Sequence, residues 1–213
     1  MRHKGSPDHQ LRQRIAVICA RLIVQESVKD FQMAKKKAAA ELGVANSKSH
    51  LPSNAEIEAE IMLYQRLFQA DNQPLHLQYL REVALKAMGL FKDFQPRLVG
   101  NVLTGTATQH SDITLHLFAQ TPETIDIFLM QQGIPYELTD KHFRIEQQSV
   151  SFPCYQFMAG DEQVSLVIFD IDDIRWSPPS PIDGKPMQRA DIKVVEKLIK
   201  DAESKSKSAR NPI

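Results

Sequence analysis

The sequence predicts an α+β fold, in which a helical N-terminal region precedes a mixed β-sheet with flanking helices. Two observations lead to this fold class. Apolar residues recur at helical spacing up to Phe91, whereas after Pro96 they alternate as they do in strands. The length of 213 residues suits one medium domain, or a small domain with a helical extension.

Composition restricts the expected partners. The chain has 26 acidic and 26 basic residues, so no overall field attracts a polyanion and any nucleic-acid binding has to be local. Cys19 and Cys154 have no partners at metal-ligand spacing, which predicts two free thiols in a reducing cytosol. The apolar run IAVICARLIV is interrupted by Arg21 and is too short to span a bilayer. We therefore expect a cytoplasmic protein with no membrane partner.

The first part of the chain has three stretches with the apolar period of a helix. The first follows Asp8, a candidate N-cap, and ends before Gly43 as one long helix or two consecutive helices. Ser53 and Glu56 have the spacing of a capping box that opens the second, and Pro74 opens the third. The expected bounds are 8–42, 53–68 and 74–91.

Two strands are expected on either side of a small-residue turn, over residues 98–103 and 112–118. Successive side chains of a strand point to opposite faces, so the second strand has one apolar and one polar face. The polar face carries Asp112, Thr114 and His116.

The remaining elements are short. Strands are expected at 135–138, 142–146, 153–158 and 164–171. Helices are expected at 121–133 and from 190 to about 204, the latter followed by a frayed tail. Gly160-Asp161 predicts a tight hairpin between the last two strands. The predicted regions are a helical N-terminal region (1–72), an α+β domain (73–186), and a C-terminal helix with a flexible tail (187–213).

Gly100-Asn101 is followed by a ten-residue spacer and then by Asp112-Ile113-Thr114. This pattern resembles the signature of the nucleotidyltransferase fold of the DNA polymerase beta type, in which two small residues precede a strand with two acidic residues separated by one apolar residue. The order of helix, strand, small-residue turn, strand and helix also resembles that fold, over roughly residues 75–171. The segments LPSNAEIEAEIMLYQRLF and SPIDGKPMQRA are similar to an uncharacterised bacterial-type group with the same fold and no assigned reaction.

The resemblance implies nucleotidyl transfer, in which two Mg²⁺ ions held by carboxylates offset charge on the attacking and leaving oxygens. Asp112 is then the catalytic residue and a metal ligand. Glycine and small hydroxyl residues let backbone amides approach the phosphates of a nucleoside triphosphate. The candidate nucleotide-binding residues are Gly100, Asn101, Thr104, Gly105, Thr106, Ser111, Thr114 and His116.

The chain departs from the family pattern at its acidic positions. Asn101 replaces the usual Gly or Ser, which is a mild change, but Thr114 replaces the second carboxylate. The expected third carboxylate is missing from the middle of the strand at 164–169. Asp170 and Asp172 follow that strand and are the candidate additional ligands for Mg²⁺.

Three functions are compatible with this pattern. The first is a degenerate nucleotidyltransferase-like protein that binds a nucleotide or nucleic acid rather than acting as an efficient transferase. The second is an active magnesium-dependent enzyme that moves a nucleoside monophosphate to a small molecule, protein or RNA. The third is a protein-interaction module, such as a homodimer formed through the helix face of Ile57, Ile61 and Tyr64.

A basic run on the N-terminal helices offers a route to RNA binding. Lys35, Lys36 and Lys37 are consecutive on a predicted helix. The other basic residues of this region are Arg12, Arg14, Arg21 and Lys29. A solvated helix face is the competing interpretation, because the acidic segment IEAEI offsets this charge and aromatic residues that stack on bases are absent.

Overall fold

The computed structural model describes residues 7–28, 30–44 and 50–210. These residues belong to two compact units. The first comprises Met1–Pro74, Thr106–Ser111 and Pro181–Asp183, and the second comprises Leu75–Gly105, Asp112–Ser180 and Gly184–Ile213. Lys29 of the predicted basic face and residues 45–49 of the predicted loop lie outside the described part.

The first unit is built on three helices, which are α1 (Pro7–Gln25), α2 (Phe31–Glu41) and α3 (Asn54–Phe68). Of the two alternatives expected before Gly43, one long helix or two consecutive helices, the structure has the second. Asp8 lies in the first turn of α1 rather than at its cap, whereas the capping box of Ser53 and Glu56 is present. The apolar faces form one core that includes Ile15, Cys19, Ala34, Ala38, Ile57 and Ile61.

The second unit contains a five-stranded sheet. Its strands are β1 (Arg97–Val99), β2 (Ile113–Ala119), β3 (Glu137–Ile145), β4 (Gln148–Ala159) and β5 (Glu162–Asp170). The strand order is β1-β2-β5-β4-β3, with β2 and β5 parallel and every other pair antiparallel. The sheet is mixed, and the predicted α+β class is confirmed.

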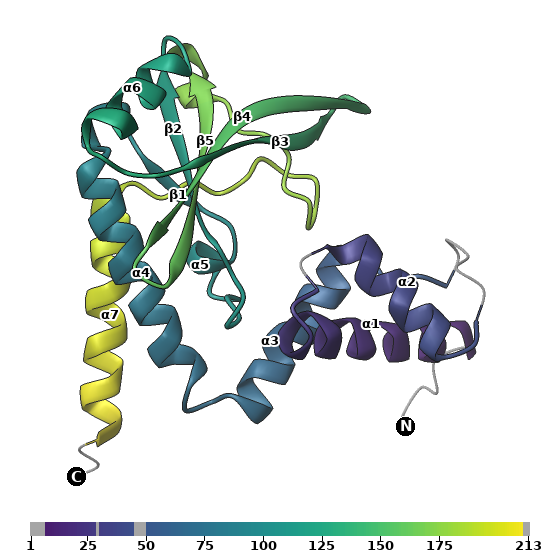
Figure 1. The fold of residues 1–213 in the computed structure, drawn as a ribbon. Helices are drawn as coiled ribbons and strands as arrows, with labels where there is room; N and C mark the ends of the chain where they lie inside the picture. The colour runs from purple at the N-terminus through teal and green to yellow at the C-terminus, as the bar shows by residue number, and fades with distance from the viewer. Residues whose placement is uncertain (1–6, 29, 45–49, 211–213) are drawn as a thin grey trace. The chain divides into compact units, whose positions relative to one another are not determined.

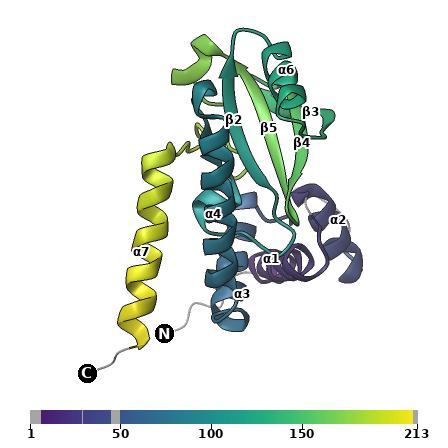
Figure 2. The ribbon, with the colours of Figure 1, turned by 60° about the vertical axis from the view of Figure 1, so that its left-hand side comes forward.

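The helices of this unit are α4 (Gln73–Leu90), α5 (Asn101–Thr104), α6 (Glu123–Gln131) and α7 (Ile192–Arg210), with short 3-10 turns η1 (Lys92–Phe94) and η2 (Ile171–Arg175). One face of the sheet, which includes the buried Leu115, Leu117, Leu166 and Ile168, packs against α4 and α6 (Figure 2). Phe91, just after α4, contacts Phe128 of α6 and Phe157 of β4. The opposite face carries polar side chains at the Thr114 end of β2 and a second buried cluster of Phe118, Phe143, Cys154, Val167 and Phe169.

Several predicted bounds were wrong, each for a local reason. The strand expected at 98–103 ends at Val99, because Gly100 (φ +72°) turns the chain into α5. The strands expected at 135–138 and 142–146 form one strand, β3, and α7 continues six residues beyond Ser204, through most of the expected tail. The hairpin at Gly160-Asp161 is confirmed, since Ala159 pairs with Glu162.

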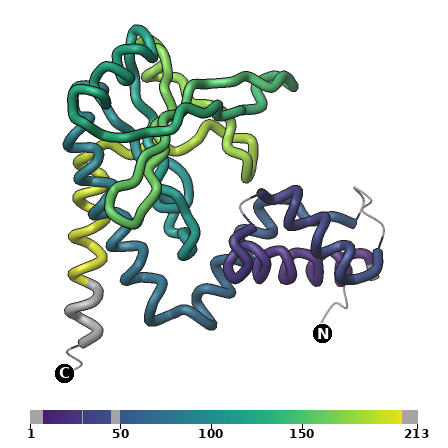
Figure 3. The backbone as a smooth tube through the Cα atoms, viewed as in Figure 1, coloured from purple at the N-terminus to yellow at the C-terminus, as the bar shows by residue number. Residues whose placement is uncertain are grey.

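β3 and β4 form a long hairpin that extends from the sheet (Figure 3). Its turn consists of Glu146 and Gln147, which both have positive φ, at 46° and 68°. This backbone is that of a two-residue hairpin turn in which Asn-Gly is preferred. The sequence carries no such signal here, which explains why the turn was not predicted.

Candidate functional site

A row of polar side chains crosses the sheet on the face opposite α4 and α6. Thr114 of β2 pairs with Ser165 of β5, and Ser165 pairs with Gln156 of β4. Paired residues of neighbouring strands point to the same face. Asp112 directly precedes β2, two residues before Thr114, and we expect the strand alternation to extend to it. We call Asp112, Thr114, Ser165 and Gln156 the polar row. Thr114 lies on the predicted face, whereas Asp112 precedes β2 and its place on that face stays a prediction.

The polar row is linked by hydrogen bonds and charge to Cys154 on the same face. Gln156 Nε2 donates to Ser165 Oγ at 3.4 Å. Burial raises the pKa of the Cys154 thiol, contacts with the Thr139 and Ser165 hydroxyls lower it, and the Asp112 carboxylate raises it. The negative charge of Asp112 thus contributes to the electrostatic environment of the Cys154 thiol. Cys154 and Cys19 are both buried free thiols, as predicted.

The polar row holds one carboxylate, that of Asp112, which directly precedes β2. Where an acidic ligand would be expected beside Asp112, the structure has the hydroxyls of Thr114 and Ser165. Glu137 of β3 pairs with Gln156 and lies on the same face, three strands from Thr114. With strands about 4.8 Å apart, that separation is roughly 14 Å, which is too far for one metal ion to bridge.

The structure does not bring Asp170 and Asp172 to Asp112. β2 and β5 are parallel, with Ile113 paired to Val164 at one end and Ala119 paired to Asp170 at the other. Seven residues at about 3.3 Å each place Asp170 roughly 23 Å from Asp112. One metal site therefore cannot include both, and the predicted shared ligand set is corrected. Among the described residues, no group of three or more His, Cys, Asp or Glu residues is arranged to hold a metal ion.

Gly100 and Asn101 reach the end of the sheet at which Asp112 lies, because Val99 pairs with Thr114. Gly100 precedes α5 and Asn101 begins it; α5 is a single helical turn that ends at Thr104. Gly105 follows with φ +94°, and its N–H donates to Asn101 O at 2.9 Å. The two glycines supply the positive φ angles with which the chain enters α5 from β1 and leaves it.

Arg81 positions this turn and was not found from the sequence. Its side chain is 9% exposed. Nε donates to Val102 O at 3.0 Å and Nη2 donates to Leu103 O at 3.1 Å. Burial lowers the pKa of Arg81. A guanidinium on α4 therefore satisfies carbonyls that a one-turn helix leaves without partners. An arginine in the middle of an amphipathic helix gave no signal for this role.

Thr106 and Ser111, both predicted to bind nucleotide, belong to the first unit. The Thr106 carbonyl accepts from Gln65 Nε2 at 3.2 Å, and its hydroxyl bonds to Glu58. Ser111 Oγ accepts from Thr108 N at 2.9 Å and closes a tight turn. These contacts give both residues structural roles in the first unit.

His116 lies on the predicted face but is completely buried. Its Nδ1 accepts a hydrogen bond from Arg189 Nε at 3.0 Å. Rings of Phe143 and Phe169 lie beside it. Burial, then the charges of Arg189 and Lys141, hold its pKa well below 6.5. His116 is therefore a neutral core residue, and its predicted contact with a nucleotide is corrected because no part of it reaches solvent.

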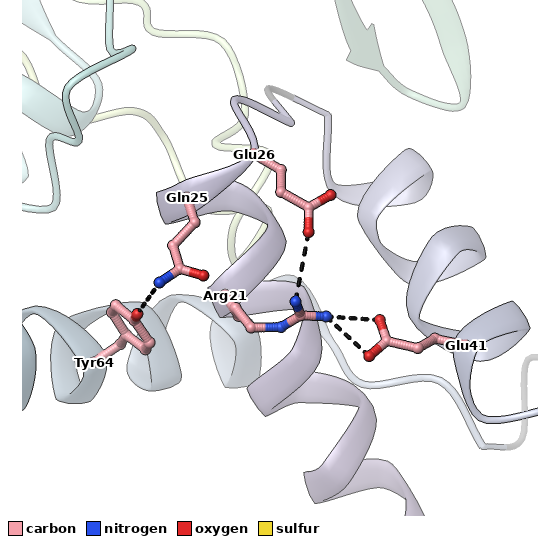
Figure 4. A network of polar contacts seen from close by, with 5 residues as sticks. All are labelled: Arg21, Gln25, Glu26, Glu41 and Tyr64. Atoms are coloured by element: carbon pink, nitrogen blue, oxygen red, sulfur yellow. Dashed lines mark hydrogen bonds and ion pairs between the residues drawn. The ribbon is translucent and has the colours of Figure 1, made fainter.

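The predicted basic face of the N-terminal helices is not continuous. Lys35 is buried against the core, and burial lowers its pKa. Arg21 Nη2 contacts both carboxylate oxygens of Glu41, at 2.9 and 2.7 Å, and Nη1 contacts Glu26 at 3.5 Å (Figure 4). Acidic neighbours thus neutralise Arg21. A phosphate-binding side built on these residues loses two of its members.

The helix face proposed for dimerisation is also a core face. Ile57 is 0% exposed and Ile61 is 4% exposed, inside the first unit. Tyr64 accepts a hydrogen bond from Gln25 Nε2 at 2.6 Å (Figure 4). A dimer contact through these three residues would require the unit to open.

Comparisons with family models, curated proteins and solved structures found no match. Within the described ranges, no helix is long and apolar enough to cross a membrane.

Proposed function

We propose that the chain is a nucleotidyltransferase-like protein that binds a nucleotide at the polar row and does not transfer it efficiently. The observation that supports this proposal is the pairing of Thr114 with Ser165 on the face that we expect Asp112 to share. Hydrogen-bonding groups stand side by side there, while the carboxylates needed to hold two divalent ions do not.

The shortage of carboxylates at this face limits its capacity for metal-dependent phosphoryl transfer. Two-metal phosphoryl transfer places the ions about 4 Å apart, and the carboxylates bridge and surround them. A hydroxyl is a weak magnesium ligand that adds no negative charge, so Thr114 and Ser165 do not substitute for acids. The donor set does not fit a two-metal centre.

Binding a nucleotide requires fewer charges than transferring it. The half-buried Thr114 hydroxyl and Gln156 amide donate and accept hydrogen bonds, and the Asp112 carboxylate accepts from amino or hydroxyl groups. Ser165, 6% exposed, accepts from Gln156 and supports that amide. The polar edges of a base and the hydroxyls of a ribose offer the complementary groups. A hydrogen bond to the charged Asp112 is worth more than one to a neutral neighbour.

Calorimetric titration with ATP, CTP, GTP and UTP tests this function. We expect heat with at least one nucleotide, and similar affinity in magnesium and in EDTA. Asp112→Asn should weaken binding about 10-fold and Thr114→Val about 3-fold, in line with about 1.4 and 0.7 kcal/mol for the lost hydrogen bonds. Asp170→Asn, at the other end of the sheet, is the matched control and should change nothing.

Two results would reject the proposal. One is the absence of heat with all four nucleotides. The other is pyrophosphate release from a nucleoside triphosphate that depends on magnesium and is lost in Asp112→Asn, because this result would identify an active transferase.

A further inference from the structure

A hollow of about 300 Å³ lies beside the edge strand β1, in the second unit. It is formed where η1 leads into β1 and where α7 begins. Its lining residues are Lys92, Gln95, Pro96, Arg97, Asp191, Ile192 and Lys193. We call it the β1–α7 hollow. None of these residues belongs to the polar row.

The charges around the β1–α7 hollow are unbalanced. Lys92, Arg97 and Lys193 are cationic, and the one acidic lining residue is Asp191. None of the three cations forms an ion pair within the described residues. The Asp191 carboxylate accepts a hydrogen bond from Val194 N at 2.9 Å, so one of its oxygens is already engaged.

Arg97 is held in place at the wall of the hollow. Its Nη1 donates to Gln95 O and to Pro96 O, both at 3.1 Å. These bonds fix the guanidinium while Nε and Nη2 make no hydrogen bond to a described residue. Burial, followed by the charge of Arg97, lowers the pKa of Arg189 to about 10.

We propose that the β1–α7 hollow binds a small anion with a terminal phosphate dianion. Three cations against one engaged carboxylate favour a ligand with more than one negative charge. The volume is at the lower end of small-molecule sites, which suits a phosphate group with a short attached moiety. The three cations line a single hollow, so a compact dianion is a better match than an extended phosphodiester backbone.

Side chains, rather than the start of α7, carry this proposal. Asp191 caps the helix by accepting from Val194 N, so that amide is not available to a ligand. The side chains of Lys92 and Lys193 make no hydrogen bond or ion pair within the described residues. A bound dianion would give all three cations a partner at once.

Titration of the full chain with inorganic phosphate, pyrophosphate and the phosphodiester UpU tests the proposal. We expect pyrophosphate to bind more tightly than UpU by at least 10-fold, with an affinity that falls as salt rises. Arg97→Gln should lower pyrophosphate affinity about 10-fold, and Lys92→Gln and Lys193→Gln several-fold each. Lys197→Gln, one turn later on α7 and exposed, is the matched control and should behave as wild type.

Equal affinity of wild type and the three lining variants would overturn the proposal, as would UpU binding as tightly as pyrophosphate. Lys92→Gln removes no hydrogen bond within the described residues, so it reports on the site even if Arg97→Gln unfolds. Asp170→Asn, which belongs to neither site, should leave pyrophosphate affinity unchanged. The polar row is tested with nucleotides and its own variants, so the two proposals can fail independently.

Discussion

Arg189 Nε donates to His116 Nδ1 at 3.0 Å, across 73 residues of sequence. The bond makes Nδ1 an acceptor, so the neutral imidazole carries its proton on Nε2. The same guanidinium lies 4.9 Å from the ring centre of Phe118 and 4.8 Å from that of Phe169. It also donates to the carbonyls of Asp173 and Trp176. One side chain thus fastens the segment around η2 to the sheet.

The His116–Arg189 pair predicts that stability falls in acid. The folded-state pKa of His116 lies well below 6.5 because of burial, followed by the charges of Arg189 and Lys141. The charge of Arg97 lowers the pKa of Arg189 itself, and that of Asp173 raises it. Below pH 6.5 the unfolded chain binds a proton that the folded chain does not, so the free energy of unfolding decreases as pH falls. Above pH 6.5 His116 is neutral in both the folded and the unfolded chain, so its contribution to the free energy of unfolding is fully present there.

Urea denaturation across pH 7.5 to 4.5 measures this effect. His116→Gln keeps an acceptor for Arg189 but does not titrate, and should show a flatter profile below pH 6.5. His142→Gln, in an exposed part of β3, is the control and should keep the wild-type slope. An unchanged slope in His116→Gln would show that His116 is not the group responsible.

Arg189→Met should loosen the segment that contains Trp176. The variant leaves the His116 acceptor and the two carbonyls without a donor, which costs about 2–4 kcal/mol. Trp176 is the one tryptophan of the chain and contacts Phe152 and Phe169, so its emission reports directly on this segment. We expect a red shift at neutral pH. Arg175→Met, whose side chain is exposed, should leave the emission unchanged.

The sequence predicted those elements whose determinants are local. The capping box at Ser53, the hairpin at Gly160-Asp161 and the apolar alternation of β2 depend on neighbouring residues, and all three were confirmed. The roles of Arg81 and Arg189 depend on partners far along the chain, and a period in the sequence does not reveal them. The same holds for the separation of Asp112 from Asp170, which follows from strand direction and register.

The turn between β3 and β4 predicts a gain in stability. Glu146 and Gln147 both adopt positive φ, which residues with a Cβ atom rarely do. Replacing the pair by Asn-Gly should raise the free energy of unfolding by about 1 kcal/mol, measured by urea denaturation. Gly160→Ala in the other hairpin (φ +67°) is the converse control and should be destabilising. No gain in the Asn-Gly variant would mean that the turn is not strained.

Arg81→Met should destabilise the α5 turn. Removing the guanidinium leaves Val102 O and Leu103 O without their donor, at a cost of about 1–3 kcal/mol. Amide hydrogen exchange should then accelerate at Gly105, whose N–H closes the turn. Lys86→Met, exposed on the same helix, should leave that exchange rate at the wild-type value. Equal rates in both variants would contradict the role given to Arg81.

The most direct test of the central claim is a series of ¹H–¹⁵N NMR spectra of the full chain, titrated in EDTA with ATP, CTP, GTP and UTP in turn. For at least one nucleotide, the binding site proposed at the polar row predicts the largest shifts at Asp112, Thr114, Gln156 and Ser165. If no nucleotide moves these amides, or if the shifts are confined to 92–97 and 191–193, the polar row is not a nucleotide site.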